Sequence, residues 1–181
     1  MNPPRLQQKY KEQVVPKLMA EFKYKTVMAV PRIEKAVVNV GFGKIAKEGK
    51  VIEKIEGELI KITGQKPVFR KAKKSIAGFK LRQGVPIGMV VTLRGRRMYD
   101  FIDRLINIAL PRTRDFRGIG KESFDNLGNL SIGIREHNIF PEAGYETAKD
   151  IFGFSVTITT SAREKDEGVV LLRLMGFPIK E

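Results

Sequence analysis

The chain has 181 residues, of which 34 are Lys or Arg and 20 are Asp or Glu, so its formal net charge is +14 and its pI is about 10.1. A charge of this size predicts a polyanionic partner, either a nucleic acid or an anionic membrane. The absence of cysteine excludes disulfides, thiolate zinc sites and cysteine nucleophiles, and the lack of a long apolar run or signal-peptide region favours a cytoplasmic protein.

The first predicted element is an amphipathic helix over residues 4–23, with Pro16 as a candidate kink. Its apolar positions recur every four residues, at Leu6, Tyr10, Val14, Leu18 and Phe22. A half-buried strand is predicted next, because two sets of positions alternate in IEKAVVNVGFG. The expected inward set is Ala36, Val38, Val40 and Phe42, and the outward set is Lys35, Val37 and Asn39.

Helical spacing returns in GKVIEKIEGELIKITG, and Gly64 is placed to end that helix in a left-handed cap. Its apolar stripe is Ile52, Ile55, Leu59 and Ile62. Strands are predicted over residues 68–71 and 87–93. The helix after them is expected to end at Pro111 and to face inward through Met98, Phe101, Leu105 and Ile108.

Three more strands are predicted after a long basic connection, over residues 130–134, 154–158 and 170–174. A hairpin turn in REKDEG is expected to join the last two. Each helix has one apolar stripe and each strand one apolar side, which favours an α+β fold with helices packed on one face of a mainly antiparallel sheet. The length favours a single domain over residues 1–181, from which long basic loops project.

The face of the sheet that the helices leave uncovered is predicted to be polar and basic. Its expected members, none of them acidic, are Lys35, Asn39, Thr92, Arg94, Ser131, Arg135, Thr157, Thr159 and Arg173. Such a face can donate hydrogen bonds to phosphates, riboses and base edges. The alternative is that Ser and Thr simply suit a solvated strand surface.

Charge is distributed unevenly along the chain. Residues 1–121 carry 28 of the 34 basic side chains and 10 of the 20 acidic ones, a net charge of +18, whereas residues 122–181 carry −4. The first two thirds are therefore expected to face the polyanion. The last third could face a basic partner or be a mildly acidic solvated surface.

The segment KPVFRKAKKSIAGFKLRQG, residues 66–84, contains seven basic residues and no acidic one, and it predicts a projecting loop over residues 71–86. Loops of this length in compact domains are usually functional. The basic side chains can neutralise phosphates while Phe79 stacks against a base or ribose. The alternative is a solvated hairpin tip whose Phe79 folds back onto the core.

A second basic loop over residues 111–129 places arginines on a chain that also contains glycine. Its basic residues Arg112, Arg114, Arg117 and Lys121 are interleaved with Phe116, Ile119 and Phe124. Arginine in such a loop suits bidentate contacts to phosphate. A merely exposed loop is the alternative.

No catalytic, cofactor or metal site is predicted. Gly41 and Gly43 follow a strand, and Ala46 occupies the third glycine position of a dinucleotide motif, a substitution that this motif tolerates, but no acidic residue closes a second strand at the required distance. His137 is the only histidine, too little for a histidine-rich metal site or a catalytic triad, and we expect it to be satisfied locally. These features argue against a nucleic-acid-modifying enzyme, and the modest charge of the N-terminal helix argues against a peripheral membrane protein.

Several segments together resemble the bacterial form of large-subunit ribosomal protein L-five (L5), the 5S rRNA-binding family. They are VPRIEKAVVNVGFG, TGQKPVFRKAKKSIAGFKLRQG, VTLRGRRMYDFIDRLINIALPR, RDFRG and SFDNLGNLSIGIREHNIFPE. The resemblance extends from Tyr24 to the C-terminal region. It implies an α+β fold that binds 5S rRNA through the sheet region, at matching positions that include Asn39, Gln65, Lys66 and Thr92. Lys35 and Arg94 of the uncovered face complete the predicted 5S rRNA contacts.

The resemblance also implies contacts for both basic loops. The projecting loop matches the family's loop that reaches the elbow of peptidyl-site tRNA, with predicted contacts Lys71, Lys73, Lys74, Ser75, Phe79, Lys80, Leu81 and Arg82. The segments around residues 111–117 and 136–145 resemble the region that meets the small-subunit head protein S-thirteen in an intersubunit bridge. Arg112, Arg114 and Arg117 are predicted to contact that bridge or rRNA.

The sequence therefore predicts a non-enzymatic structural protein of the large ribosomal subunit, located in the cytoplasmic ribosome. Its expected partners are 5S rRNA, large-subunit rRNA, peptidyl-site tRNA and S-thirteen. S-thirteen is basic in the family, so the acidic final third of the chain would be the surface that faces it.

Overall fold

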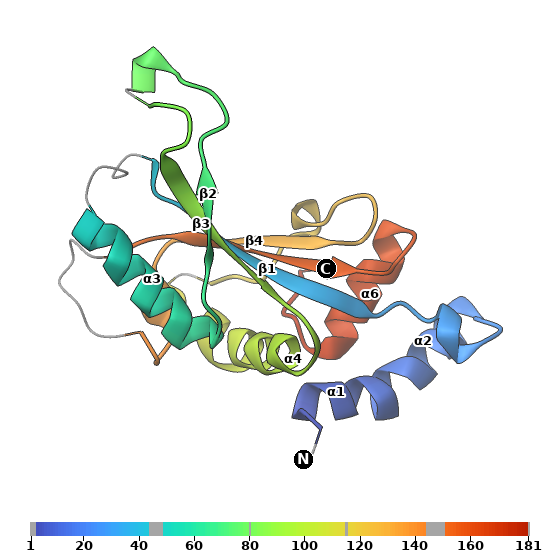
Figure 1. Cartoon of the computed structure of the whole chain (residues 1–181). Coiled ribbons are helices and arrows are strands. Elements are labelled where there is room, and N and C mark those ends of the chain that lie inside the picture. The colour runs from blue at the N-terminus through green and yellow to red at the C-terminus, as the bar shows by residue number, and fades with distance from the viewer. Residues whose placement is uncertain (1–2, 44–48, 80, 115, 144–150, 181) are drawn as a thin grey trace. The chain divides into compact units, whose positions relative to one another are not determined.

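The computed structural model describes residues 3–43, 49–79, 81–114, 116–143 and 151–180. Within these residues the protein is α+β, with a five-stranded antiparallel sheet and four helices (Figure 1). The strands are β1 (Ile33–Gly41), β2 (Val68–Lys71), β3 (Pro86–Leu93), β4 (Leu130–Ile134) and β5 (Phe154–Thr160), in the order β2-β3-β1-β5-β4. The predicted fold class is thereby confirmed.

Two of the four helices are composite. The N-terminal helix consists of α1 (Arg5–Lys9), a π turn (Tyr10–Val14) and α2 (Val15–Phe22). The other composite helix consists of α4 (Gly95–Arg104), a π turn (Leu105–Ala109) and α5 (Leu110–Arg112). The remaining helices are α3 (Gly49–Thr63) and α6 (Lys165–Met175).

The chain divides into two compact units. The first unit contains Met1–Ala36, Leu93–Ile132 and Thr157–Glu181, and the second unit contains Val37–Thr92 and Gly133–Val156. The N-terminal helix, α4, α5 and α6 belong to the first unit, whereas α3 and β2 belong to the second. Strands β1, β3, β4 and β5 each contribute residues to both units.

The central strands have one buried side and one open side, as predicted. In β1 the side chains of Ala36, Val38 and Val40 are buried, whereas Asn39 between them is exposed. Strand β5 alternates in the same way over its whole length. Period-two burial is what a sheet covered on one face requires.

The N-terminal helix widens to a π turn immediately before Pro16. The amide of Val15 donates to the carbonyl of Tyr10, five residues earlier. In a regular α-helix the proline ring would clash with the carbonyl four residues before it, and the wider turn relieves this clash. The predicted disturbance at Pro16 is therefore a π turn within a continuous helix.

The same device occurs before Pro111, where the amide of Leu110 donates to the carbonyl of Leu105. The π turn adds a residue and rotates the apolar face. Ile108, expected to face inward, is 38% exposed, whereas Ala109 and Leu110 are buried. The predicted end at Pro111 is also wrong by one residue, because the helix continues to Arg112.

The predicted strand over residues 170–174 is wrong, because this segment lies in helix α6. The apolar run VVLLRLM fits strand alternation and helical spacing equally well, so periodicity alone cannot decide between them. The buried side chains follow helical spacing, at Val169, Leu171, Leu172 and Met175.

The predicted hairpin turn in REKDEG is wrong as well. Asp166 and Glu167 lie in the first turn of α6, where carboxylates face the positive end of the helix dipole. Arg173 is exposed on this helix and is therefore not part of an open sheet face.

Glu167 joins the N-terminal segment to α6 within the first unit. One carboxylate oxygen accepts the Tyr24 hydroxyl at 2.5 Å, and the other accepts the Arg163 amide at 2.8 Å. Partial burial raises the pKa of Glu167, but these hydrogen bonds outweigh it and hold the pKa below its ordinary value. The carboxylate therefore contributes stability in its ionised form.

Glu167→Gln is expected to lower the free energy of unfolding at pH 7 by about 1 kcal/mol. Because the folded-state pKa is depressed, the stabilisation is full above the unfolded pKa, near 4.5, and is lost as the pH falls through the folded pKa. Urea denaturation at pH 7 and pH 3 should thus show a difference between variant and wild type that shrinks in acid. An equal difference at both pH values would contradict the ionised role.

Candidate nucleic-acid interface

In the second unit, the open side of β1 and β3 presents Asn39 and Thr92. Both side chains are exposed on neighbouring strands, between residues that are buried. No described residue hydrogen-bonds the side-chain amide of Asn39 or the hydroxyl of Thr92. Their backbone carbonyls are engaged instead, that of Thr92 by the Gln65 amide at 3.2 Å and that of Asn39 by the Ser155 hydroxyl at 3.5 Å. The two polar side chains are thus available to a partner.

Gln65 and Lys66 follow the end of α3, which is stopped at Gly64 with a positive φ of 66°, as predicted. The hydrogen bond from Gln65 to Thr92 brings two of the predicted contact residues together. Lys66 is exposed and its ammonium lies 3.8 Å from the Glu56 carboxylate. An exposed pair at this distance is weak and leaves the lysine able to contact phosphate.

The other two predicted sheet contacts lie in the first unit. Lys35 is half-buried on β1, and Arg94 is exposed at the residue that precedes α4. Strand β1 departs from strict alternation here, because both Glu34 and Lys35 lie between the buried residues Ile33 and Ala36. The structure therefore adds one exposed carboxylate, that of Glu34, which the alternating pattern did not indicate.

The projecting loop between β2 and β3 is internally hydrogen-bonded. The Ala72 amide donates to Val85 at 2.8 Å at its base, and the Ile76 amide donates to Leu81 at 3.0 Å near its tip. The Gln83 amide donates to the Ser75 hydroxyl at 3.0 Å. The loop therefore extends beyond the strands as a bonded hairpin (Figure 1).

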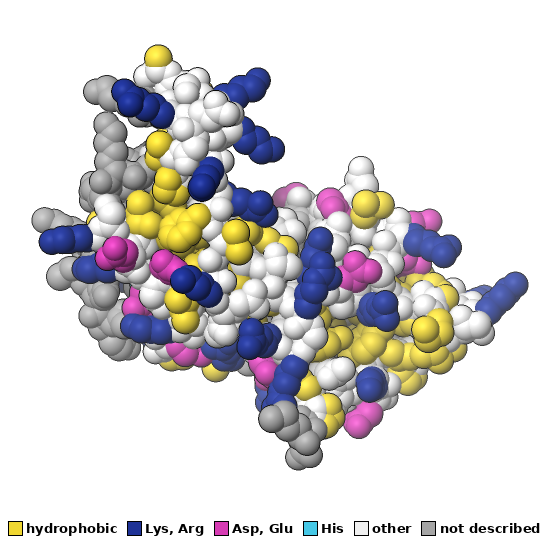
Figure 2. Space-filling model, in the orientation of Figure 1, with side chains coloured by type: hydrophobic (Ala, Val, Ile, Leu, Met, Phe, Trp, Pro, Cys, Tyr) yellow, Lys and Arg dark blue, Asp and Glu magenta, His cyan; other side chains and the backbone are white. Residues whose placement is uncertain are grey.

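The surface of the projecting loop is cationic. Lys71, Lys73, Lys74 and Arg82 are all exposed, and none lies within ion-pair distance of a carboxylate in the described part of the chain. Figure 2 shows Lys and Arg side chains spreading outward from the projecting loop, with no acidic side chain among them on that face. Lys80 lies outside the described residues. Phe79 is 79% exposed, which excludes the alternative that it folds back onto the core.

The second basic loop is anchored in the first unit. Arg112, Arg114 and Arg117 are exposed, while the chain after them pairs with the C-terminal segment. The Ile119 amide donates to Pro178 at 2.8 Å, and the Lys180 amide donates to Ile119 at 2.9 Å. This loop is therefore held in place rather than merely exposed.

The apolar residues of this second loop differ in solvent exposure. Ile119 and Phe124 are buried, and Phe116 is half-buried. Only Phe116 retains surface that a partner could contact. Residues 144 and 145 of the other predicted bridge segment lie outside the described residues.

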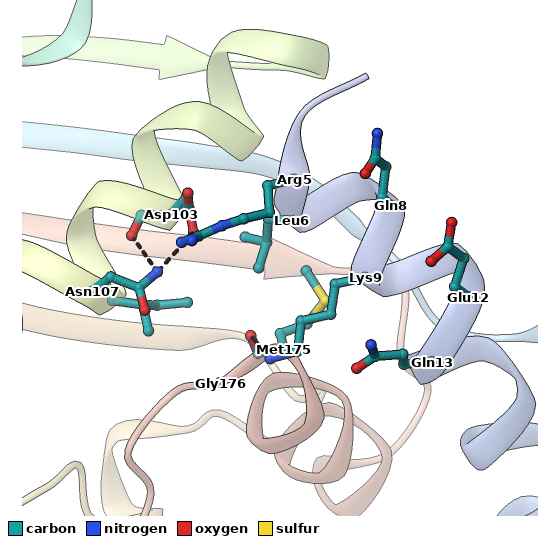
Figure 3. Close-up of a pocket in the computed structure, with 11 residues that line it drawn as sticks. Arg5, Leu6, Gln8, Lys9, Glu12, Gln13, Asp103, Asn107, Met175 and Gly176 are labelled. Atoms are coloured by element: carbon teal, nitrogen blue, oxygen red, sulfur yellow. Dashed lines mark hydrogen bonds and ion pairs between the residues drawn. The ribbon is translucent and has the colours of Figure 1, made fainter. Parts of the chain in front are cut away.

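A polar pocket of about 390 Å³ lies between the N-terminal helix, α4 and the end of α6 (Figure 3). Its cations hold the helices together: the Arg5 guanidinium lies 2.9 Å from the Asp103 carboxylate, and the Lys9 ammonium donates to the Met175 carbonyl at 3.0 Å. Asn107 also donates to Asp103, at 2.7 Å. This pocket is therefore a helix junction in which Arg5, Lys9 and Asp103 are already engaged.

The single histidine is a structural residue of the second unit. His137 is buried, its ring stacks on Phe152 at 4.1 Å, and its Nδ1 accepts the Phe152 amide at 3.4 Å. No group of three potential metal ligands occurs among the residues that the structure describes. Within the same residues, no helix is both long enough and apolar enough to cross a membrane.

Comparison with known proteins covers almost the whole chain. Residues 26–82 match the family described as Ribosomal protein L5, and residues 86–179 match the model of the C-terminus of the same ribosomal family. The chain is 51% identical over 176 residues to the large ribosomal subunit protein uL5 of Halothermothrix orenii, covering 97% of this chain and 98% of the relative. It is 53% identical to uL5 of Cupriavidus taiwanensis with the same coverage, and 52% identical to uL5 of Chloroflexus aurantiacus, with 98% of each chain covered.

Proposed function

The chain belongs to the ribosomal protein L5 family and is a non-enzymatic structural constituent of the large ribosomal subunit, and from this premise we propose that it binds 5S rRNA through the open side of its sheet. The proposed contacts are Lys35, Asn39, Gln65, Lys66, Thr92 and Arg94. Family membership also bears out the predicted location in the ribosome and the predicted absence of catalysis.

The observation that carries this proposal is the exposed pair Asn39 and Thr92. An amide and a hydroxyl on adjacent strands, with no partner among the described residues, can both donate to and accept from RNA. Ribose 2′-hydroxyls, phosphates and base edges offer the complementary groups. Gln65, bonded to the backbone of β3 beside Thr92, would add a further amide to the same contact.

The test is the double variant Asn39→Ala with Thr92→Ala. Two lost hydrogen bonds of roughly 0.5–1.5 kcal/mol each should weaken 5S rRNA binding about tenfold, measured by filter binding at fixed salt. Both residues are exposed, so the fold should be unaffected. A matched control is Asn138→Ala with Thr26→Ala, which removes the same two exposed side-chain types elsewhere and should leave the affinity unchanged. Equal affinities for the two double variants would sink the proposal.

The two basic loops extend the proposed function beyond 5S rRNA. The projecting loop, with Lys71, Lys73, Lys74, Ser75, Phe79, Lys80, Leu81 and Arg82, would contact peptidyl-site tRNA. Its exposed aromatic ring and its lysine and arginine side chains, those described having no ion pair within the described part of the chain, are the combination that stacks on nucleotides and neutralises phosphate. The exposed side chains of Arg112, Arg114 and Arg117 would contact large-subunit rRNA or the small-subunit head protein S-thirteen.

A further inference from the structure

A second pocket of the first unit lies between the start of β1 and the start of α4. Its volume is about 340 Å³, and its lining consists of Arg32, Ile33, Glu34, Arg94, Gly95, Met98 and Tyr99. Met98 and Ile33 are buried and give the pocket an apolar floor. The two arginines are exposed and stand at its edge.

Tyr99 is the informative residue of this pocket. Its side chain is only 8% exposed, yet its hydroxyl makes no hydrogen bond to any residue that the structure describes. The neighbouring Tyr10 differs, because its hydroxyl donates to the Pro31 carbonyl at 3.1 Å. The Tyr99 hydroxyl itself keeps accessible surface, so it can donate to a group that enters the pocket.

The charges around the pocket favour an anionic partner. No carboxylate of the described residues lies within ion-pair distance of Arg32 or Arg94. Burial raises the pKa of Tyr99, and the positive charge of Arg32 offsets part of that rise. Glu34 is an exposed carboxylate on the same lining and is outnumbered by the arginines.

The start of α4 adds to this positive potential. No side chain caps it, and its first turn contains no acidic residue. Gly95 has a positive φ of 57°, and the space where a Cβ would lie is open, so the backbone there can be approached closely. The unbonded amides of a helix start are themselves donors to anions.

We propose that this pocket binds one phosphodiester group of an rRNA backbone, with Arg32 and Arg94 pairing with the phosphate oxygens and the Tyr99 hydroxyl donating to one of them. The apolar floor of Ile33 and Met98 would receive the adjoining ribose. The inference rests on the proposed RNA-binding function, and it adds Arg32 and Tyr99 as contacts that the sheet face does not include.

The test compares Arg32→Gln and Tyr99→Phe in the full chain, by filter binding to 5S rRNA and, separately, to the large rRNA of the subunit across a KCl series. A lost phosphate contact should lower the slope of log affinity against log salt by about 0.9 for Arg32→Gln. Tyr99→Phe should weaken the same RNA by about three- to tenfold and leave the slope unchanged, because a neutral donor is lost.

Two controls distinguish the loss of this phosphate contact from a general loss of positive charge and from unfolding. Arg173→Gln removes an exposed arginine that lines neither pocket and should leave affinity for that RNA unchanged. Tyr99→Phe should retain the wild-type melting temperature, because its hydroxyl has no partner among the residues that the structure describes. If neither RNA distinguishes the two pocket variants from Arg173→Gln, the inference is overturned.

A third comparison tests whether the group bound in the pocket is an anion. Glu34→Gln should raise the affinity for the RNA that the Arg32 and Tyr99 variants bind more weakly, by about two- to threefold more than Glu21→Gln does. Glu21 is an exposed glutamate of the same unit and lies outside the pocket. Weaker binding by Glu34→Gln would mean that the pocket does not hold an anion. Failure of the Asn39 and Thr92 test would leave these comparisons unaffected, because each is scored against wild type and a matched charge control.

Discussion

Replacing Gly168 by alanine is expected to destabilise the protein by about 3 kcal/mol, the upper part of the range for overpacked sites. Gly168 is the fourth residue of α6 and is buried, and a Cβ there would overlap the backbone of Gly128. From the other side, a Cβ on Gly128 would lie 2.8 Å from the Gly168 Cα. Because backbone faces backbone, no flexible side chain can move aside, and the helix itself would have to shift.

Gly57→Ala is the matched control, since it makes the same chemical change inside a helix. A Cβ at Gly57 meets nothing within 4 Å, so the substitution should instead stabilise α3 by about 0.5–1 kcal/mol through lower backbone entropy in the unfolded chain. Urea denaturation of both variants measures the two changes. Destabilisation of the same size at both glycines would show that close packing is not the cause at Gly168.

The parts of the fold that the sequence predicts are those in which local pattern and tertiary burial agree. From Ala36 onward strand β1 alternates in both sequence and burial, and α3 ends before the predicted Gly64. Helix α6 was missed because seven consecutive residues are nearly all apolar, so both periodicities fit. The acidic pair before that run was the discriminating signal: Asp166 and Glu167 suit a first helical turn better than a tight hairpin.

The sequence likewise predicts some parts of the candidate interface and not others. The cationic loop and the polar sheet positions lie in continuous sequence patterns. The structure leaves Asn39, Thr92 and the described loop cations exposed, whereas Lys35 is half-buried and Arg173 lies on α6. The pocket of Arg32 and Tyr99 was missed, because its residues are 67 positions apart and Tyr99 looks like an ordinary helical residue in sequence. Only the tertiary structure reveals that its hydroxyl has no partner among the described residues.

Deleting residues 75–81 is expected to leave 5S rRNA binding intact and to impair retention of peptidyl-site tRNA on assembled ribosomes. The β2–β3 pairing, from Val68 opposite Val90 to Lys71 opposite Pro86, lies outside the deletion. The hydrogen bond between Gln83 and Ser75 shows that the two arms of the loop lie close together, so the shortened chain can rejoin without separating the strands.

The expected loss of tRNA retention can be estimated from Phe79, the exposed aromatic residue of the loop. Stacking of one base on an aromatic ring contributes about 1–3 kcal/mol, so loss of Phe79 alone should speed tRNA dissociation by roughly tenfold or more. Phe79→Ala tests this without shortening the loop. Met28→Ala is its control, because Met28 is a still more exposed apolar residue, at 88%, and lies outside the loop.

The two readouts assign the loop to one of two roles. Unchanged 5S rRNA affinity together with faster tRNA dissociation from ribosomes carrying the deletion would fit a loop that reaches a separate RNA. Loss of 5S rRNA binding on deletion would instead place the loop in the 5S platform, since the paired strands and the side chains of Asn39 and Thr92 remain in the variant. Because exposed lysines add a salt-dependent component at any polyanion, both measurements have to be made at the same ionic strength.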